Sequence, residues 1–314
     1  MVTSIVPLYM VILSLETIYG ITTNGFIIFF ICFYWVKGQD KSDSNKMILA
    51  LSISNVLYAC VSYVNVLLFY FHPIIYLKTS ISPAVFVFAM FIITSSSWLT
   101  ACLCFFYFMK IQTFRSDVLS RLKTKITSAV PWMMLVSELV SAVTASLNVF
   151  EFLQNDGSHK NISVVELAMK KSKSNGIFSN NLYISFISSV LPFLISVVTT
   201  GATVWALNKH TKKMERNHTK SSAAVNVKAY KNTIRNMIRL LIFYAIFYVT
   251  LFLFYFNLFT TYSTGFWVFL MEIFLYAPVQ STILILANIK LKKVWRRIFH
   301  CSTMSSLEEE SSND

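Results

Sequence analysis

Seven long apolar stretches constrain this chain more than any other feature. Each reaches the ~20 residues that a helix needs to cross the hydrocarbon core of a bilayer. No Lys or Arg lies inside a stretch away from its ends. Backbone groups in lipid must be hydrogen-bonded internally and no run of alternating polarity predicts barrel strands, so we expect seven membrane helices. The predicted spans are 8–36, 47–71, 83–109, 126–149, 180–207, 237–259 and 265–289.

The composition excludes several other classes of protein. Apolar residues make up 55% of the 314 residues and charged residues only 13%, whereas soluble domains average about 25% charged. The 28 Phe, 15 Tyr and 6 Trp require burial or lipid, which excludes a disordered chain. Five Cys are too few for a secreted disulfide scaffold. We therefore expect an all-α membrane protein with a single seven-helix domain over residues 1–314.

The basic residues fall on alternate connecting segments. Of the 27 Lys and Arg, 22 lie in segments 37–46, 110–125, 208–239 and 290–314. Because basic loops stay in the cytoplasm, this asymmetry predicts an external N-terminus and a cytoplasmic C-terminus. The formal charge of +13 is thus explained by membrane topology and contact with anionic lipid, and we expect no nucleic-acid partner.

Two terminal segments and one sequon complete this topology. Residues 290–301 mix basic and apolar side chains, which predicts an amphipathic helix on the inner membrane surface, and Cys301 is a candidate for palmitoylation. The Ser- and Glu-rich residues 302–314 predict a disordered tail. Asn161 begins an Asn-Ile-Ser sequon in the predicted outer loop 150–179, so we expect glycosylation there.

Three carboxylic acids lie within the predicted spans: Glu16, Glu138 and Glu272. An ionisable group in the membrane is costly, so each is a candidate functional residue. The alternative is that each is protonated or hydrogen-bonded to a neighbouring helix. Glu16 and Glu272 lie toward the predicted outer ends of their spans, and Glu138 lies near the middle of the fourth.

Four asparagines also lie in or beside the spans. Asn24, Asn55 and Asn288 are nearer the predicted cytoplasmic half, where interhelical hydrogen bonding is the expected role. Asn65 is nearer the outside, where contact with a ligand is the alternative.

Prolines and aromatic residues mark the later spans. Pro192 interrupts span five and Pro278 span seven, and each removes a backbone donor that favours a kink. Tyr248, Phe252 and Tyr255 share one helical face in span six by their i, i+4, i+7 spacing. That face is a candidate pocket wall, with packing or lipid contact as the alternative.

The sequence lacks the motifs of an enzyme. It contains no HExxH pair, no GxSxG elbow and no glycine-rich phosphate loop. None of the five His is spaced from Cys or another His as metal ligands are. We expect no catalytic activity, no metal and no cofactor. A seven-helix transporter or channel remains an alternative, although the three acids have no basic partner within the spans for a relay.

Seven spans, an external N-terminus and a basic third inner loop suggest a G-protein-coupled receptor. The rhodopsin-like Asp-Arg-Tyr and Asn-Pro-x-x-Tyr motifs are absent, because span three ends in FYFMK and span seven in ILANIKL. The motifs that are present resemble, in order, those of the bitter taste receptor family (type 2 taste receptors). They are GITTNGFI at 20–27, LSISN at 51–55, WLTACLCFFYFMKI at 98–111, LPFLIS at 191–196, ALNKHTKKM at 206–214 and QSTILILANIKLKK at 280–293.

The resemblance implies a plasma-membrane receptor for small bitter organic compounds that signals through a heterotrimeric G protein of the gustducin-like, inhibitory class to phospholipase C and calcium release. The ligand residues that it implies, together with the candidates above, are Asn65, Ala89, Ile93, Tyr248, Phe252, Tyr255, Leu270, Glu272 and Ile273. The implied coupling residues are Tyr107, Lys110, His210 and Lys213. The implied switch or structural residues are Glu16, Asn24, Asn55, Pro192, Pro278, Gln280 and Ser281.

The sequence departs from the family pattern at four positions. Asn55 and Gln280 stand where the family usually has Arg and His, so we expect the inner helix network to differ. Ala89 and Ile93 stand where the family often has Trp and Asn, which predicts a more apolar cavity. A vomeronasal type 1 receptor is the alternative family.

Overall fold

The computed structural model describes most of the seven predicted spans. The described residues are 2–38, 42–73, 76, 81–111, 117–156, 179–216, 221–255, 263–288 and 290–298. Every long element among them is an α-helix, and none of these residues lies in a strand. The predicted fold class, an all-α seven-helix membrane protein, is confirmed.

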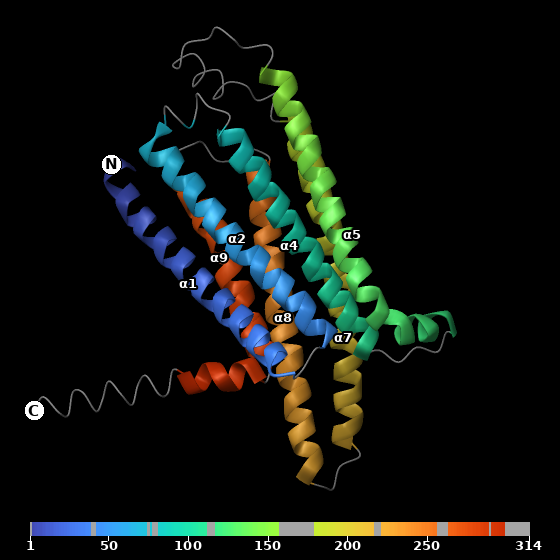
Figure 1. The fold of residues 1–314 in the computed structure, drawn as a ribbon. Helices are drawn as coiled ribbons and strands as arrows, with labels where there is room; N and C mark the ends of the chain where they lie inside the picture. The colour runs from blue at the N-terminus through green and yellow to red at the C-terminus, as the bar shows by residue number, and fades with distance from the viewer. Residues whose placement is uncertain are drawn as a thin grey trace, which may run out of the picture.

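Among the described residues, seven helices are long and apolar enough to cross a membrane. They are α1 (Val2–Val36), α2 (Asp43–Phe71), α4 (Ile81–Ile111), α5 (Asp117–Asp156), α7 (Ser179–Arg216), α8 (Ser221–Tyr255) and α9 (Thr264–Ala287). A shorter helix at 290–298 runs across one end of the bundle (Figure 1).

The helices form a closed bundle. Consecutive helices pack side by side, and α4 also contacts α7, so that it adjoins α2, α5 and α7. The ring closes where α9 packs on α8 and on α1. We call the end at which α1 begins the upper end, and the end that carries the short helix the lower end, as in Figure 1. Because α4 packs extensively on α2, α5 and α7, it is the central helix of the bundle.

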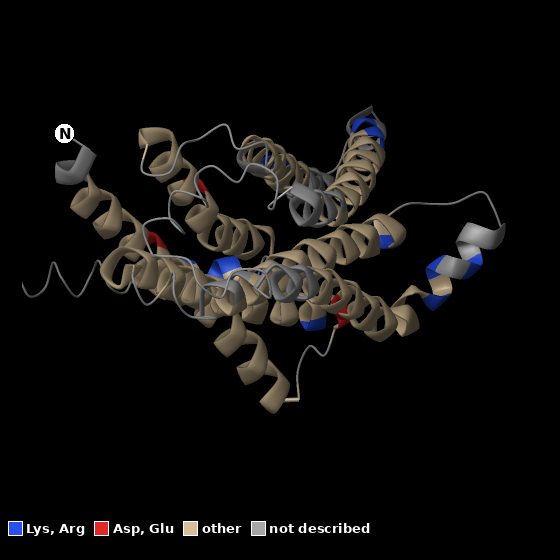
Figure 2. Cartoon of the chain, turned by 90° about the horizontal axis from the view of Figure 1, so that it is seen from above, with Lys and Arg blue, Asp and Glu red and all other residues tan. Residues whose placement is uncertain are grey.

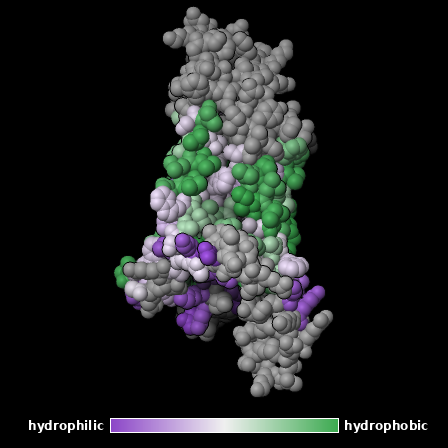
Figure 3. Space-filling model, turned by 90° about the vertical axis from the view of Figure 1, so that its right-hand side faces the viewer, coloured by the Kyte–Doolittle hydropathy of each residue, from purple (hydrophilic) through white to green (hydrophobic). Residues whose placement is uncertain are grey.

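The outer surface of the bundle is apolar. Large side chains such as Phe29, Trp132 and Val198 are strongly exposed. Figure 3 shows an apolar band along the described part of the bundle, with hydrophilic side chains gathered below it. The view along the bundle in Figure 2 shows few charged residues on the helices. Such a surface suits lipid rather than water.

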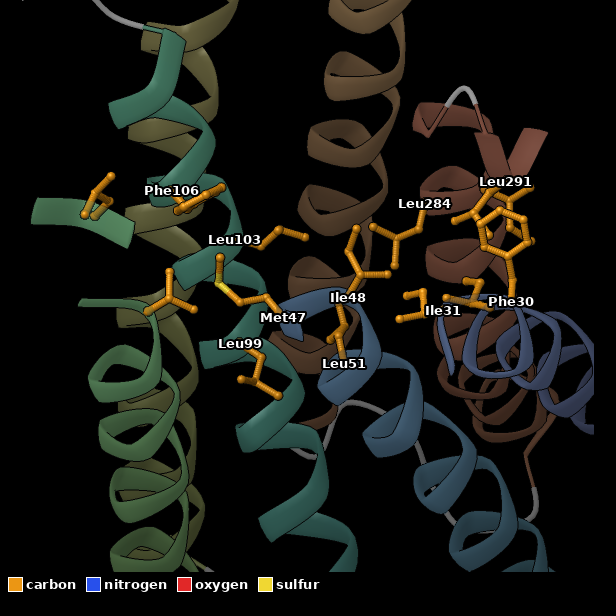
Figure 4. Packing of buried hydrophobic residues seen from close by; sticks show 14 of the residues in the cluster. Phe30, Ile31, Met47, Ile48, Leu51, Leu99, Leu103, Phe106, Leu284 and Leu291 are labelled. Carbon is orange, nitrogen blue, oxygen red and sulfur yellow. The ribbon is translucent and has the colours of Figure 1, made fainter. Parts of the chain in front are cut away.

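Aliphatic packing holds the lower half together. Phe30 of α1, Met47 of α2, Phe106 of α4 and Leu284 of α9 belong to one buried cluster, and Leu291 anchors the short helix to it (Figure 4). Because lipid is as apolar as these side chains, close packing is what favours their association. The short helix is therefore docked on the bundle by its own apolar residues.

Aromatic and aliphatic residues together pack the upper half. One cluster joins Tyr58, Ile93, Phe247 and Tyr276 at the centre of the bundle. A second cluster places Trp267 of α9 against α1 and α2, where its ring stacks on Tyr9 at a centroid distance of 5.6 Å.

The contact between α1 and α9 depends on a glycine. A Cβ atom added at Gly20 would lie 3.2 Å from Cδ of Pro278, closer than most side chains tolerate. The absence of a side chain thus lets α1 pack directly on the proline of α9.

Candidate functional site

A buried polar core lies between the upper and lower clusters, and Asn55 is at its centre. The Asn55 amide nitrogen donates to Oε1 of Gln280 at 2.7 Å and to Oδ1 of Asn24 at 3.2 Å. Ser96 donates to Asn55 Oδ1 at 3.1 Å. All four side chains are fully buried, so a single residue of α2 connects α1, α4 and α9.

Gln280 extends this core to α8. Its amide nitrogen donates to Thr100 Oγ1 at 2.9 Å and to the hydroxyl of Tyr244 at 2.5 Å. The Tyr244 hydroxyl in turn donates to Thr100 at 3.2 Å. Ser281, the next residue, shares a 2.7 Å hydrogen bond with Thr23 of α1. Five helices are therefore joined by neutral groups only.

Two of the four positions at which the sequence departs from the expected pattern are thus joined directly. Asn55 and Gln280 are 225 residues apart in the sequence, and the Asn55 amide donates to the Gln280 carbonyl oxygen. Buried polar groups that are fully hydrogen-bonded fix one packing arrangement. Asn24, Asn55, Gln280 and Ser281 are among the residues predicted from the sequence, whereas Tyr244, Ser96 and Thr100 are not.

Three of the predicted ligand residues meet in the upper half. Ile93 of α4 is buried, and Tyr248 of α8 and Ile273 of α9 pack against its cluster. The ring of Tyr248 lies on Phe193 of α7 at a centroid distance of 4.4 Å. Four helices contribute to this contact, and Phe193 was not among the predicted residues although it directly follows Pro192.

Glu272 lies at the α8–α9 contact beside this cluster. Thr250 of α8 donates a hydrogen bond to Oε2 of Glu272. Oε1 is buried and accepts no hydrogen bond from any of the described residues. A buried carboxylate oxygen without a donor is costly, so this atom has an unused capacity to accept a hydrogen bond.

The other predicted ligand residues are more scattered. Leu270 packs with Trp267 in the second upper cluster, and Asn65 of α2 accepts a 3.0 Å hydrogen bond from Tyr76. Ala89 is half-buried, while Phe252 is exposed on the side of α8. The side chain of Tyr255 lies outside the described part.

The predicted coupling residues lie at the lower end. Tyr107 is half-buried in α4, and the exposed Lys110 ammonium lies 4.9 Å from the ring centroid of Phe106. His210 and Lys213 fall on α7, but their side chains lie outside the described part. Asn161, Cys301 and the tail 302–314 are also outside it.

Two further polar residues have structural partners. Ser95 donates to Oε1 of Glu138 at 2.7 Å and so links α4 to α5. Oδ1 of Asn288 accepts hydrogen bonds from the backbone nitrogens of Lys290 and Leu291 at the start of the short helix. Both residues therefore act as interhelical or capping groups. No group of metal-binding side chains occurs among the residues described.

A closed bundle of seven membrane-length helices with a buried polar core is consistent with the architecture of a G-protein-coupled receptor. The family model for the taste receptor protein (TAS2R) matches residues 1–303. The chain belongs to this family, the bitter taste receptors, and is a multi-pass plasma-membrane protein that responds to small molecules through a G protein.

Individual relatives agree with this assignment along most of their length. The chain is 27% identical to human "Taste receptor type 2 member 2" over 306 residues, which is 93% of this chain and 95% of that protein. It is 27% identical to human "Taste receptor type 2 member 39" (94% of this chain, 87% of that protein). The identity is also 27% to "Taste receptor type 2 member 8" of Gorilla gorilla gorilla (94% and 96%). These matches favour the taste receptor family over the vomeronasal and transporter alternatives.

Proposed function

We propose that this receptor binds small amphipathic bitter compounds between α4, α7, α8 and α9, with Glu272 as the polar anchor. The observation that carries the proposal is the buried Oε1 of Glu272, which has no donor among the described residues and lies beside a wall of aromatic and aliphatic side chains. Ligand sites of this type are largely apolar with a few placed polar groups.

The lining residues divide into a wall and a rim. Ile93, Tyr248 and Ile273 form the wall by their shared cluster. Asn65, Ala89, Phe252, Tyr255 and Leu270 form the rim in this proposal. Apolar residues at Ala89 and Ile93, where relatives often have Trp and Asn, favour agonists that differ from those of better known members.

The proposed topology follows from charge. The basic segments 37–46, 110–125, 208–239 and 290–314 place the lower end in the cytoplasm by the positive-inside rule. Agonists then enter from the outside at the upper end.

A gustducin-like, inhibitory-class G protein binds at Tyr107, Lys110, His210 and Lys213, and phospholipase C and calcium release follow. Because a ligand shifts an equilibrium only by its differential affinity, the agonist must bind the active packing more tightly.

A calcium assay tests the receptor class. Cells that express the full chain with a gustducin-chimeric G protein should respond to members of a broad panel of bitter compounds, and the response should vanish without the G protein. Surface staining of the same cells controls for expression. Silence from a well-stained receptor would contradict the bitter-ligand assignment and favour a pheromone-type ligand set.

Replacing Glu272 with glutamine tests the anchor. For cationic agonists we expect the half-maximal concentration to rise about tenfold or more, since a charge-assisted hydrogen bond contributes ~1.5–3 kcal/mol. Neutral agonists should change far less. Glu138→Gln removes the same charge from a carboxyl already paired with Ser95 and serves as the control. Equal losses for cationic and neutral agonists would exclude Glu272 as the anchor.

A further inference from the structure

A groove of about 360 Å³ lies between α1 and α9, away from the α8 contact that holds Glu272. Leu15 and Tyr19 of α1 and Leu275 of α9 line it, and all three are exposed on the outside of the bundle. Pro278 forms part of its floor. Because the helices are of membrane length and their outer surface is apolar, this groove opens toward lipid.

Glu16 is the one ionisable carboxyl in the lining of this groove. Its Oε2 atom is buried and has no hydrogen-bond partner among the described residues. The two hydroxyls nearby are already engaged, because Tyr19 and Thr282 share a 3.2 Å hydrogen bond and Thr282 also donates to the carbonyl of Pro278 at 2.8 Å. The carboxyl is thus the unsatisfied polar group of an otherwise apolar groove.

No basic side chain of α1 or α9 is near enough to neutralise this carboxyl. Lys37 is the first basic residue of the chain and lies roughly 30 Å further along the helix by its rise per residue. The sequence of α9 contains no Lys or Arg. Glu138 and Glu272, by contrast, each accept a hydrogen bond from a neighbouring helix. Charge complementarity therefore favours a cation from outside the protein.

We propose that this groove is a binding site for lipophilic amines that enter from the bilayer. The ammonium group donates to the Glu16 carboxylate, and the apolar body lies on Leu15 and Leu275. A hydroxylated lipid offers only a neutral donor, which is about half as strong as a charge-assisted one. The site is separate from the proposed agonist site, since its walls are α1 and the outer face of α9.

Photolabelling of the purified full chain in phosphatidylcholine nanodiscs tests the proposal. The probes are N,N-dimethyldodecylamine with a diazirine in its chain and a dodecanol with the same diazirine. We expect the amine to label peptides of α1 and α9 and to bind about tenfold or more tightly than the alcohol, as a charged hydrogen bond implies. Unlabelled amine should displace the label, and mass spectrometry locates it.

Three variants separate charge from shape. Glu16→Gln should weaken amine binding about tenfold or more and leave the alcohol unchanged. Leu275→Trp fills the groove and should abolish labelling by both probes there. Glu138→Gln removes a carboxyl elsewhere and should change neither.

Equal affinity of the wild-type groove for amine and alcohol would overturn the proposal and indicate a site for hydroxylated lipids. Labelling spread evenly over all seven helices would show that no site exists. Because the comparison of the two probes uses the wild-type chain, it decides the matter even where Glu16→Gln fails to fold. The readout is binding, so its result is independent of any agonist or G protein.

Discussion

Replacing Asn55 with leucine is expected to lower the stability of the receptor more than any other change in the polar core. Leucine keeps the number and branching of the side-chain heavy atoms but removes the amide that donates to Asn24 Oδ1 and to Gln280 Oε1. Both oxygens then lack this donor in a fully buried site. Each orphaned acceptor costs ~1–3 kcal/mol, so the expected loss is about 2–6 kcal/mol.

The neighbouring substitution Gln280→Met should cost less, although Gln280 makes as many hydrogen bonds. Its partners keep others, because Tyr244 still bonds Thr100 and Asn55 still bonds Asn24. Three interhelical hydrogen bonds at ~0.6 kcal/mol each amount to about 2 kcal/mol. The order of the two effects therefore tests the geometry of the core and not merely its polarity.

The measurement is the unfolding temperature of the purified receptor in detergent, followed by tryptophan fluorescence, with surface staining in cells. Asn65→Leu is the matched control, since it makes the same change in the same helix at a half-buried residue that accepts one hydrogen bond from Tyr76. An Asn55→Leu protein as stable as the Asn65→Leu protein would contradict the central role of Asn55.

The second large effect is expected for Phe106→Ala at the lower end. The Phe106 ring is fully buried in the lower cluster, where it packs among residues of α2 and α5 (Figure 4). Truncating a buried phenylalanine costs ~3–5 kcal/mol through lost contacts and the cavity that remains. We expect poor surface expression and a strongly lowered unfolding temperature.

Lys110→Ala separates packing from charge at the same place. The Lys110 ammonium lies over the Phe106 ring, but an exposed cation–π contact contributes only ~0.5–1 kcal/mol. This variant should therefore reach the surface and remain stable, while its calcium response to agonist is lost or altered. A Lys110→Ala receptor with unchanged responses would remove this residue from the proposed coupling surface.

Part of the candidate site was accessible from the sequence because its signals are local. The polar residues Asn24 and Asn55 stand out in apolar spans, and the spacing of Tyr248 and Phe252 places them on one helical face. Yet Tyr248 is packed on Phe193 whereas Phe252 is exposed. A shared face does not specify the rotation of a helix against its neighbours, so the pattern alone does not separate packed residues from exposed ones.

The seven helices were determined by the sequence itself. Span length and apolarity are properties of continuous segments, and each such segment forms a helix in the bilayer because its backbone groups must be hydrogen-bonded within the segment. Their pairings were decided by the tertiary structure, since residues as distant as Asn55 and Gln280 meet only when α2 and α9 pack. The three intramembrane acids show the same division. In the sequence Glu16, Glu138 and Glu272 look alike. In the bundle Ser95 donates to Glu138, Thr250 donates to one oxygen of Glu272, and Glu16 faces a groove. The cost of a buried charge is set by the groups around it, and the bundle alone places those groups.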